Sequence, residues 1–179
     1  MKNHSRDIEQ LEVLRKMREM QKDSAVTLVI PTLIDLRFRQ QLLSDPETMN
    51  YNHAWGGTID WPEEEWPAWY DHWVLHPEGK RWYRYVMESG SGEFVGEAAC
   101  HWDEDRAIWC ADVIIAARHR HRGYGRAALR LLCAAAKANG VEVLRDDIAI
   151  DNPGIRMFLA EGFVEEYRTE EIIMLRKEL

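Results

Sequence analysis

Residues 118–126 read RHRHRGYGR and place five arginine or histidine side chains directly before Gly123 and Gly125. The stretch lies between a predicted strand and a predicted helix. Glycines at such a junction let the backbone approach a ligand closely, and the free N–H groups and positive dipole end of a helix start attract an anion. The stretch therefore predicts a site for a small anion such as a pyrophosphate, with a tight turn needed only for packing as the alternative.

Length and charge restrict the class of protein. The chain of 179 residues suffices for one compact domain but not for two ordinary ones, so we expect an N-terminal helical extension, 1–24, followed by a single domain, 25–179. The formal net charge of -8 argues against nucleic acid as a partner, because nucleic-acid binding depends on a broad positive surface. The positive charge of the quoted stretch is therefore expected to serve a small ligand.

The sequence shows no sign of export or membrane insertion. No segment approaches the ~20 apolar residues of a membrane span. Residues 1–23 lack the apolar core and the cleavage site of a secretory signal. Cys100, Cys110 and Cys133 are odd in number and lack metal-ligand spacing, which is typical of reduced thiols. We therefore expect a cytoplasmic protein that does not bind a membrane.

The order of the predicted elements is that of an α/β domain. Apolar residues at helical spacing between Ile8 and Met17 predict an amphipathic helix over 7–22, whose stripe packs either on the same chain or on a second copy in a homodimer. Three strand-like runs separated by SGSG and DEDR predict an antiparallel meander over 81–116. The other predicted elements are strands at 25–30, 141–150 and 170–179, and helices at 33–45, from about 62 to 73, at 124–139 and at 152–162, the last with Asn152 as N-cap and Pro153 at its first position.

Two short motifs resemble the GCN5-related N-acetyltransferase (GNAT) family. Its signature of Arg or Gln, two residues, Gly, one residue, and Gly or Ala matches Arg120, Gly123 and Gly125. The later segment DNPGIRMFLAEGF, residues 151–163, resembles the family's Asn-helix-Gly-Phe segment. The resemblance covers about residues 80–179 and implies an α/β fold. Its mixed, mostly antiparallel sheet would splay at the centre and carry helices on both faces.

The resemblance also implies acetyl-CoA as the co-substrate and assigns its binding site. The strand that contains Ile115 would pair with the pantetheine arm, Arg120 would belong to the loop signature, and Asn152 would lie near the pantetheine. The implied reaction is direct transfer of the acetyl group to an amine of a small molecule or peptide. The phosphates would face the amides of His121, Arg122, Gly123, Tyr124, Gly125 and Arg126.

Phe158 departs from the family pattern. Many members carry a tyrosine at this place as the acid toward the departing thiolate, so the resemblance implies that this acid is missing. A thiol with a pKa of about 8.5 leaves as its anion near neutral pH, so we expect a slower reaction rather than none. Two alternatives stay open: a non-catalytic module that binds or senses acyl-CoA, and a protein that binds another phosphate ligand.

Glu97 and Asp112 are the candidate proton acceptors for the amine. If DEDR closes a hairpin with a loop of two or four residues, Glu97 lies opposite Asp112 on the neighbouring strand. Like charges at such a pair raise the pKa of one carboxyl, which then accepts a proton near neutral pH. The alternatives are that both side chains point to solvent, that one pairs with Arg84 or Arg106, or that a loop of three or five residues removes the pairing.

No metal ligand set stands out in the sequence. His72 and His76 are spaced to share one helix face, but no third ligand accompanies them, so we expect two surface or half-buried histidines. The tryptophans between 51 and 73 are expected mainly in the core. The acidic runs 63–65 and 103–105 favour a cationic acceptor if they lie beside the cleft.

Overall fold

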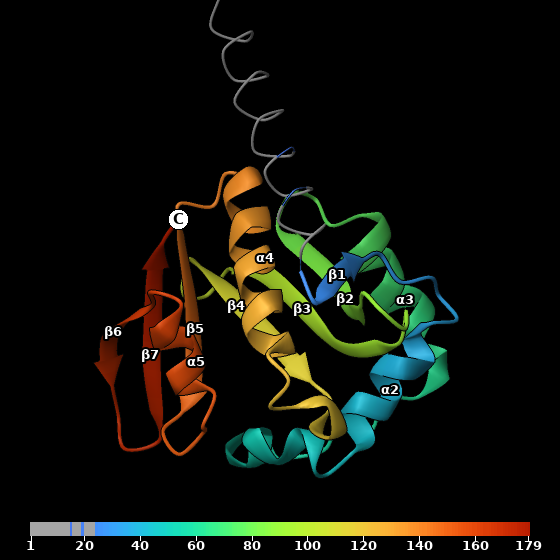
Figure 1. The fold of residues 1–179 in the computed structure, drawn as a ribbon, viewed down its shortest axis with the longest axis horizontal. Coiled ribbons are helices and arrows are strands. Elements are labelled where there is room, and N and C mark those ends of the chain that lie inside the picture. The colour runs from blue at the N-terminus through green and yellow to red at the C-terminus, as the bar shows by residue number, and fades with distance from the viewer. Residues whose placement is uncertain (1–14, 16–18, 20–23) are drawn as a thin grey trace, which may run out of the picture.

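The computed structural model describes Arg15, Glu19 and residues 24–179. Residues 24–179 contain one seven-stranded sheet in the order β1-β2-β3-β4-β5-β7-β6, with helices on both faces (Figure 1). The helix predicted over 7–22 lies outside the described residues, except for Arg15 and Glu19, which form an i,i+4 ion pair. None of the described helices has the length and apolar character needed to cross a membrane.

The strands follow the predicted order with one addition, β6. All five residues of β6 are exposed, so its sequence lacks the apolar alternation that marks a half-buried strand, and the sequence prediction omits it. It pairs with β7 at the edge of the sheet. The strands are β1 (Val26–Val29), β2 (Arg81–Glu88), β3 (Phe94–Asp103), β4 (Ile108–Ile115), β5 (Val143–Ala149), β6 (Val164–Arg168) and β7 (Ile172–Glu178).

Strands β2 to β4 form the predicted antiparallel meander, and β1 pairs antiparallel with β2 at its edge. In the β3–β4 hairpin, Asp103 pairs with Ile108, so the connecting loop consists of residues 104–107. Asp103 fixes this turn, because its Oδ1 accepts hydrogen bonds from the N–H groups of Asp105 and Arg106 at 3.0 and 2.9 Å. The turn therefore lies one residue later than symmetric closure of DEDR predicts.

The parallel pairing between β4 and β5 is short. Trp109 lies opposite Leu144 and Cys110 opposite Arg145, and no further pair of the two strands follows in the described sheet. On its other edge, β5 pairs with β7 over its whole length. The sheet is thus split at its centre beyond Cys110, which confirms the predicted architecture.

Two helices cover one face of the sheet, α4 (Tyr124–Ala138) and α5 (Ile155–Ala160) (Figure 1). The alanine- and leucine-rich sequence of α4 is typical of a helix with little side-chain entropy to lose. Its buried stripe packs on sheet residues that include Ala98, Ala111 and Leu144. Helices α4 and α5 therefore lie on the same face of the split sheet.

The opposite face carries the N-terminal helices. Trp61 and Trp66 of this layer are buried in one cluster with Ala99 of β3, whereas Trp55 is 50% exposed. The tryptophan-rich segment therefore mainly supplies core, as predicted. The elements of this layer are α2 (Leu36–Ser44), the 3₁₀ helices η1 (Thr48–Trp55) and η2 (Glu63–Glu65), α3 (Trp66–Tyr70) and the π-helix η3 (Asp71–Leu75).

Helix η1 is absent from the sequence prediction, which leaves the chain irregular after Tyr51. Asp45 explains why the helix forms, since its carboxylate accepts hydrogen bonds from the N–H groups of Glu47 at 3.3 Å and Thr48 at 3.1 Å. These contacts satisfy donors that a helix start leaves without partners. The hydroxyl of Thr48, at the start of η1, accepts a hydrogen bond from the N–H of Ala117 just after β4.

The start of α5 also differs from the sequence prediction. Oδ1 of Asn152 accepts a hydrogen bond from the N–H of Gly154 at 2.8 Å and holds a turn ahead of the helix. The N-cap is therefore Gly154, and α5 begins at Ile155 rather than at Pro153. Asn152 lies just before the start of α5 and lines the cavity at the split of the sheet.

Candidate active site

The backbone between β4 and α4 has the form of the predicted anion site. After the 3₁₀ turn η4 (Ala117–His119), the chain reaches Gly123, which is the N-cap of α4 and has a φ of +83°. His121 has a φ of +62°, so two residues of the loop turn the backbone toward the helix start. The N–H groups of 121–126 have no hydrogen-bond partner within the described part of the chain. Together with the dipole of α4, they offer donors and positive potential to a phosphate.

Gly125 keeps the space in front of this helix start open. A Cβ at this position would lie 3.1 Å from Sδ of Met157 in α5 and 3.4 Å from Cγ1 of Ile115 in β4. A longer side chain would extend into the region between β4 and α5. The second glycine of the signature therefore leaves space between Met157 and Ile115 that a side chain would occupy.

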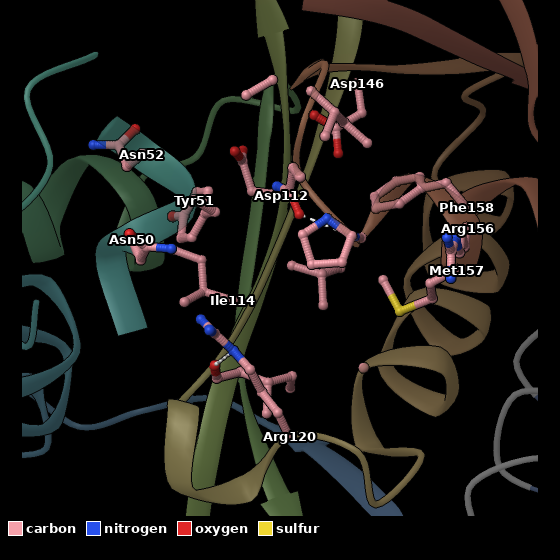
Figure 2. A pocket seen from close by; sticks show the side chains of 18 of the residues that line it. Asn50, Tyr51, Asn52, Asp112, Ile114, Arg120, Asp146, Arg156, Met157 and Phe158 are labelled. Atoms are coloured by element: carbon pink, nitrogen blue, oxygen red, sulfur yellow. Dashed lines mark hydrogen bonds between the residues drawn. The ribbon is translucent and has the colours of Figure 1, made fainter. Parts of the chain in front are cut away.

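Arg120 uses its guanidinium to hold the loop in place. Its Nε donates a hydrogen bond to the carbonyl oxygen of Ile115 at 3.2 Å (Figure 2). Its Nη2 and Nη1 donate to the carbonyl oxygens of Thr48 at 2.6 Å and Glu47 at 3.3 Å. Oγ1 of Thr48 in turn accepts a hydrogen bond from the N–H of Ala117 at 2.9 Å. These contacts fix the start of η1 against the end of β4.

A cavity of about 800 Å³ opens at the split between β4 and β5. Figure 2 shows η1 on one side of it and α5 on the other, with Arg120 and the loop at one end. This volume lies in the range of small-molecule sites. The lining includes Asn50, Tyr51, Asn52, His53 and Trp55 of η1, Asp112, Val113, Ile114 and Ile115 of β4, Asp146, Asp147, Ile148 and Ala149 of β5, and Arg156, Met157, Phe158 and Ala160 of α5.

The structure brings together all but two of the residues expected at the site. The side chain of Arg122 is exposed and does not line the cavity, and Glu97 lies outside it as well. The expected residues that line the cavity are Asp112, Ile115, Arg120, His121, Gly123, Tyr124, Gly125, Arg126 and Asn152.

The predicted pairing of Glu97 with Asp112 is wrong. Glu97 lies opposite Ile114, and Asp112 lies opposite Ala99. The difference follows from the β3–β4 turn, which closes one residue later than predicted. The two carboxylates still point to the same face of the sheet, as diagonal rather than direct neighbours.

Glu97 belongs to a buried ion pair with Arg39 of α2. Glu97 is 4% exposed, its Oε1 contacts Nη1 of Arg39, and its Oε2 accepts a hydrogen bond from the hydroxyl of Tyr83 at 2.5 Å. Trp61 and Trp69 flank the guanidinium, whose Cζ lies 5.3 and 4.7 Å from their ring centroids. Burial is the largest single influence on the pKa of Arg39 and lowers it, but the charges and hydrogen bonds of Glu97 and Tyr83 together outweigh burial and raise the pKa. Both oxygens of Glu97 are therefore occupied by protein donors.

Asp112 faces the cavity from β4, and its side chain is 52% exposed. Its Oδ2 lies 3.4 Å from Nδ1 of His101, and this contact raises the pKa of His101. In Figure 2 the Asp112 carboxylate lies beside Tyr51 of η1. Of the two predicted proton acceptors, Asp112 is therefore the one that a substrate in the cavity can reach.

The titratable cavity residues that the sequence prediction omits include Tyr51 and Asp146, whose pKa values are shifted. Burial, followed by the charge of Glu97, raises the pKa of Tyr51. Burial, followed by the charge of Asp112, raises the pKa of Asp146 well above its usual range. A signal for Asp146 exists in the sequence, because it lies between the apolar residues Leu144 and Ile148 on the same face of the strand, where a carboxylate is costly. No comparable signal marks Tyr51.

Metal ligation finds no support in the described part of the chain, where no group of three or more His, Cys, Asp or Glu side chains is arranged for a metal ion. Nδ1 of His76 lies 2.9 Å from a carboxylate oxygen of Asp71. Cys100, Cys110 and Cys133 are buried free thiols.

Known proteins that resemble this chain are acetyltransferases. Residues 41–163 match the model of the acetyltransferase (GNAT) family. Spermidine N-acetyltransferase from Vibrio cholerae, solved with CoA and spermine, has a TM-score of 0.71 at 19% identity, covering 87% of this chain and 96% of its own. Ribosomal-protein-alanine N-acetyltransferase from Brucella melitensis has a TM-score of 0.67 at 20% identity, covering 86% and 99%. A Salmonella typhimurium protein solved with its cofactor acetyl-CoA has a TM-score of 0.64 at 20% identity, covering 87% and 95%.

The split sheet, the anion-binding loop and the cavity between β4 and β5 define an acetyltransferase domain. The family match spans more than half of the residues, so the chain belongs to the GNAT family, whose members are acetyl-CoA-dependent N-acetyltransferases. A search of curated proteins gives no significant match.

Proposed function

We propose that this protein transfers the acetyl group of acetyl-CoA directly to an amine bound in the cavity. The observation that carries this proposal is that the helix-start amides and Asp112 open onto one and the same cavity. Beyond Cys110, the edge of β4 that faces β5 has no ladder partner among the described strands. Its backbone groups are free to pair with the pantetheine arm and to polarise the thioester carbonyl. Holding both substrates with their reacting atoms in contact then supplies much of the rate.

The acceptor is proposed to be a cationic amine, either a polyamine or a peptide N-terminus. Asp112, Asp147 and Asp151 line the cavity and attract an ammonium group. Trp55, on the η1 side, adds an aromatic ring that favours a cation in contact with it. The neighbours named for spermidine and for a ribosomal-protein alanine both act on amines, which supports this choice of class.

Asp112 is the proposed proton acceptor. An alkylammonium nitrogen has no free electron pair until it loses a proton, so direct transfer needs a base close to the amine. Asp112 faces the cavity from the side of the sheet that carries η1, and half of its side chain is accessible. The amine is therefore expected to approach from the η1 side.

Release of coenzyme A thiol that requires an amine tests the proposed function. In a panel of polyamines and short peptides, at least one acceptor should produce free thiol and an acetylated product that mass spectrometry detects. If calorimetry shows binding of acetyl-CoA but no amine supports turnover, the protein is instead a non-catalytic acyl-CoA module. If another phosphate compound binds and coenzyme A does not, the protein is neither an acetyltransferase nor an acyl-CoA module.

Gly125→Leu is expected to weaken acetyl-CoA binding by about 10- to 100-fold. Forcing extra methylene groups into an occupied space costs about 1–3 kcal/mol, which corresponds to a change of this size in the dissociation constant. The leucine would meet Met157 and Ile115 and fill the space in front of the phosphate-binding amides. Gly90→Leu is the matched control, because a Cβ at Gly90 has no neighbour within 4 Å. Calorimetric titration with acetyl-CoA measures both variants, and unchanged affinity in folded Gly125→Leu would contradict the placement of the cofactor.

A homodimer is also proposed, on the strength of the apolar stripe between Ile8 and Met17 in the sequence. Removal of the residues before Ser24 should then halve the molar mass measured by light scattering, apart from the mass of the deleted segment. A mass that changes only by that segment would remove the dimer role of the stripe.

A further inference from the structure

Asp146 is a cavity carboxyl that the proposed reaction has not yet used. It lies in β5 between Leu144 and Ile148, which are both buried in the cluster that contains Phe158 of α5. Alternate side chains of a strand point to the same face of a sheet, so Asp146 points to the face that carries α4 and α5. In β4, Asp112 lies opposite Ala99 and shares the other face with it, the face that η1 covers. The two aspartates thus approach the cavity from opposite faces of the split sheet.

Figure 2 agrees with this arrangement. Tyr51 and Asp112 lie on one side of the cavity, the side chains of α5 lie on the other, and Asp146 lies between them at the end opposite Arg120. Phe158, the α5 residue nearest the core, is 4% exposed and has no proton to give. Asp146 is therefore a carboxyl on the face that carries α5 and lies within reach of a ligand in the cavity.

The surroundings of Asp146 favour its protonated form. The side chain is half-buried and makes no hydrogen bond or ion pair with any described residue. Burial, followed by the charges of Asp112 and Asp147, raises the pKa of Asp146 well above its usual range, against a smaller opposing effect of Arg106. Arg106 is shared, since its Nη1 lies 3.1 Å from Asp147 and its Nε 2.7 Å from Asp103.

Charged groups of the neighbouring elements do not offset the raised pKa of Asp146. From η1, Tyr51 contributes a neutral hydroxyl whose own pKa is raised by burial. From α4, Arg126 is paired with Glu161. From α5, Arg156 is exposed at the edge of the cavity. No cation among these groups contacts Asp146, so its surroundings favour the protonated form, which can donate a proton.

We propose that Asp146 is a catalytic residue that donates a proton to the sulfur of the departing coenzyme A, an inference that rests on the proposed acetyl transfer. The cofactor phosphates are expected at the start of α4, which lies on the same face of the sheet as α5 and Asp146. The thioester sulfur then enters the split from that face. The amine approaches the carbonyl carbon from the opposite face, beside Asp112. The attacking nitrogen and the leaving sulfur are thus served by different carboxyl groups.

The proton balance of one turnover is closed by these two groups. The nitrogen forms a C–N bond with the carbonyl carbon, the C–S bond breaks, and its electron pair goes to sulfur. The ammonium nitrogen gives up two protons in all, one to solvent and one to Asp112. Asp146 gives its proton to the sulfur, which leaves as a neutral thiol. The proton held by Asp112 then passes to Asp146, which restores both carboxyl groups.

Asp146→Asn is expected to lower kcat by about 100-fold, the lower end of what general acid catalysis contributes, because a thiolate is a fair leaving group without help. The KM for acetyl-CoA and its calorimetric Kd should not change, since the variant keeps the shape of the cavity. A donor acts only while protonated, so wild-type kcat should fall as the pH rises through the pKa of Asp146. This fall of kcat at high pH, the alkaline limb of the pH profile, should be absent from the variant. A purely structural role of Asp146 would not remove it.

The outcomes of this experiment separate the two proposals. If the wild-type protein acetylates no amine, the proposed function fails. If it acetylates an amine and Asp146→Asn keeps the wild-type kcat and the alkaline limb, the role of Asp146 is refuted. Asp105→Asn, in the exposed β3–β4 turn, is the matched control and should match the wild type. Should Asp146→Asn fail to fold, Asp146→Glu takes its place, and a limb that stays at the wild-type pH overturns the proposal.

Discussion

Asp112→Asn is expected to lower kcat by about 100- to 1000-fold, within the range that a positioned general base contributes. Asparagine keeps the shape of the side chain but accepts no proton from an ammonium group near neutral pH. The affinity for acetyl-CoA should stay the same, because the phosphate-binding amides belong to the loop after β4. Initial rates of thiol release with a confirmed acceptor, together with calorimetry of acetyl-CoA binding, measure both quantities.

The pH dependence of Asp112→Asn distinguishes a missing base from a damaged site. As the pH rises, more of the acceptor amine is already neutral, so the rate of the variant should rise toward that of the wild type. The substitution also removes the contact that raises the pKa of His101, so the NMR titration of His101 should move to lower pH. Asp105→Asn again serves as the control. Wild-type turnover by Asp112→Asn across neutral pH would assign the base to another residue or to a water chain.

The cofactor loop is predictable from the sequence because its causes are local. Gly123 and Gly125 lie within a few residues of the end of β4 and the start of α4, and each has a defined steric reason to be glycine. The helix start supplies its own donors, whatever the rest of the chain does. A short motif in the correct strand-loop-helix order therefore identifies both the fold and the anion site.

The register of the β3–β4 hairpin is not predictable in the same way. Closing the loop one residue earlier or later changes which side chains are opposite each other, and DEDR offers two aspartates, at 103 and 105, either of which suits a turn. In the structure, the side chain of Asp103 caps the turn, and Ala107 adopts a φ of +51°. Composition does not reveal an alanine in this conformation, so the pairing of Glu97 with Asp112 fails although both residues lie on the predicted strands.

The remaining parts of the site depend on contacts between distant segments. Arg39 is 58 positions from Glu97 in the sequence, and no local pattern connects the two. Tyr51 reaches the cavity because Arg120 and Thr48 fix η1 to the end of β4. Asp146 becomes a site residue only because β5 separates from β4 beside it. Tertiary packing, rather than any motif, decides which carboxyl groups face the substrate.

Glu97→Gln is expected to destabilise the fold by about 3 kcal/mol, the lower end of the cost of leaving one member of a buried ion pair without its partner. Arg39 would keep its charge among Trp61, Trp69 and Tyr83, which contact its guanidinium but cannot neutralise it. Glutamine retains an oxygen that can accept the hydrogen bond from Tyr83. The loss of stability therefore reports mainly on the missing negative charge of Glu97. Equilibrium unfolding in urea, with an unchanged slope, measures the difference in the free energy of unfolding.

A second substitution separates this explanation from a simple packing defect. Arg39→Met combined with Glu97→Gln removes the unpaired cation and fills its place with an apolar chain, which should recover most of the lost stability because apolar replacements of buried ion pairs are often neutral or stabilising. Glu64→Gln, at an exposed position of η2, is the control for loss of one negative charge. If the double variant is as unstable as the single one, the ion pair is not the cause. A Glu97→Gln protein as stable as the wild type but deficient in turnover would make Glu97 a candidate proton acceptor again, despite the two donors that occupy its carboxylate.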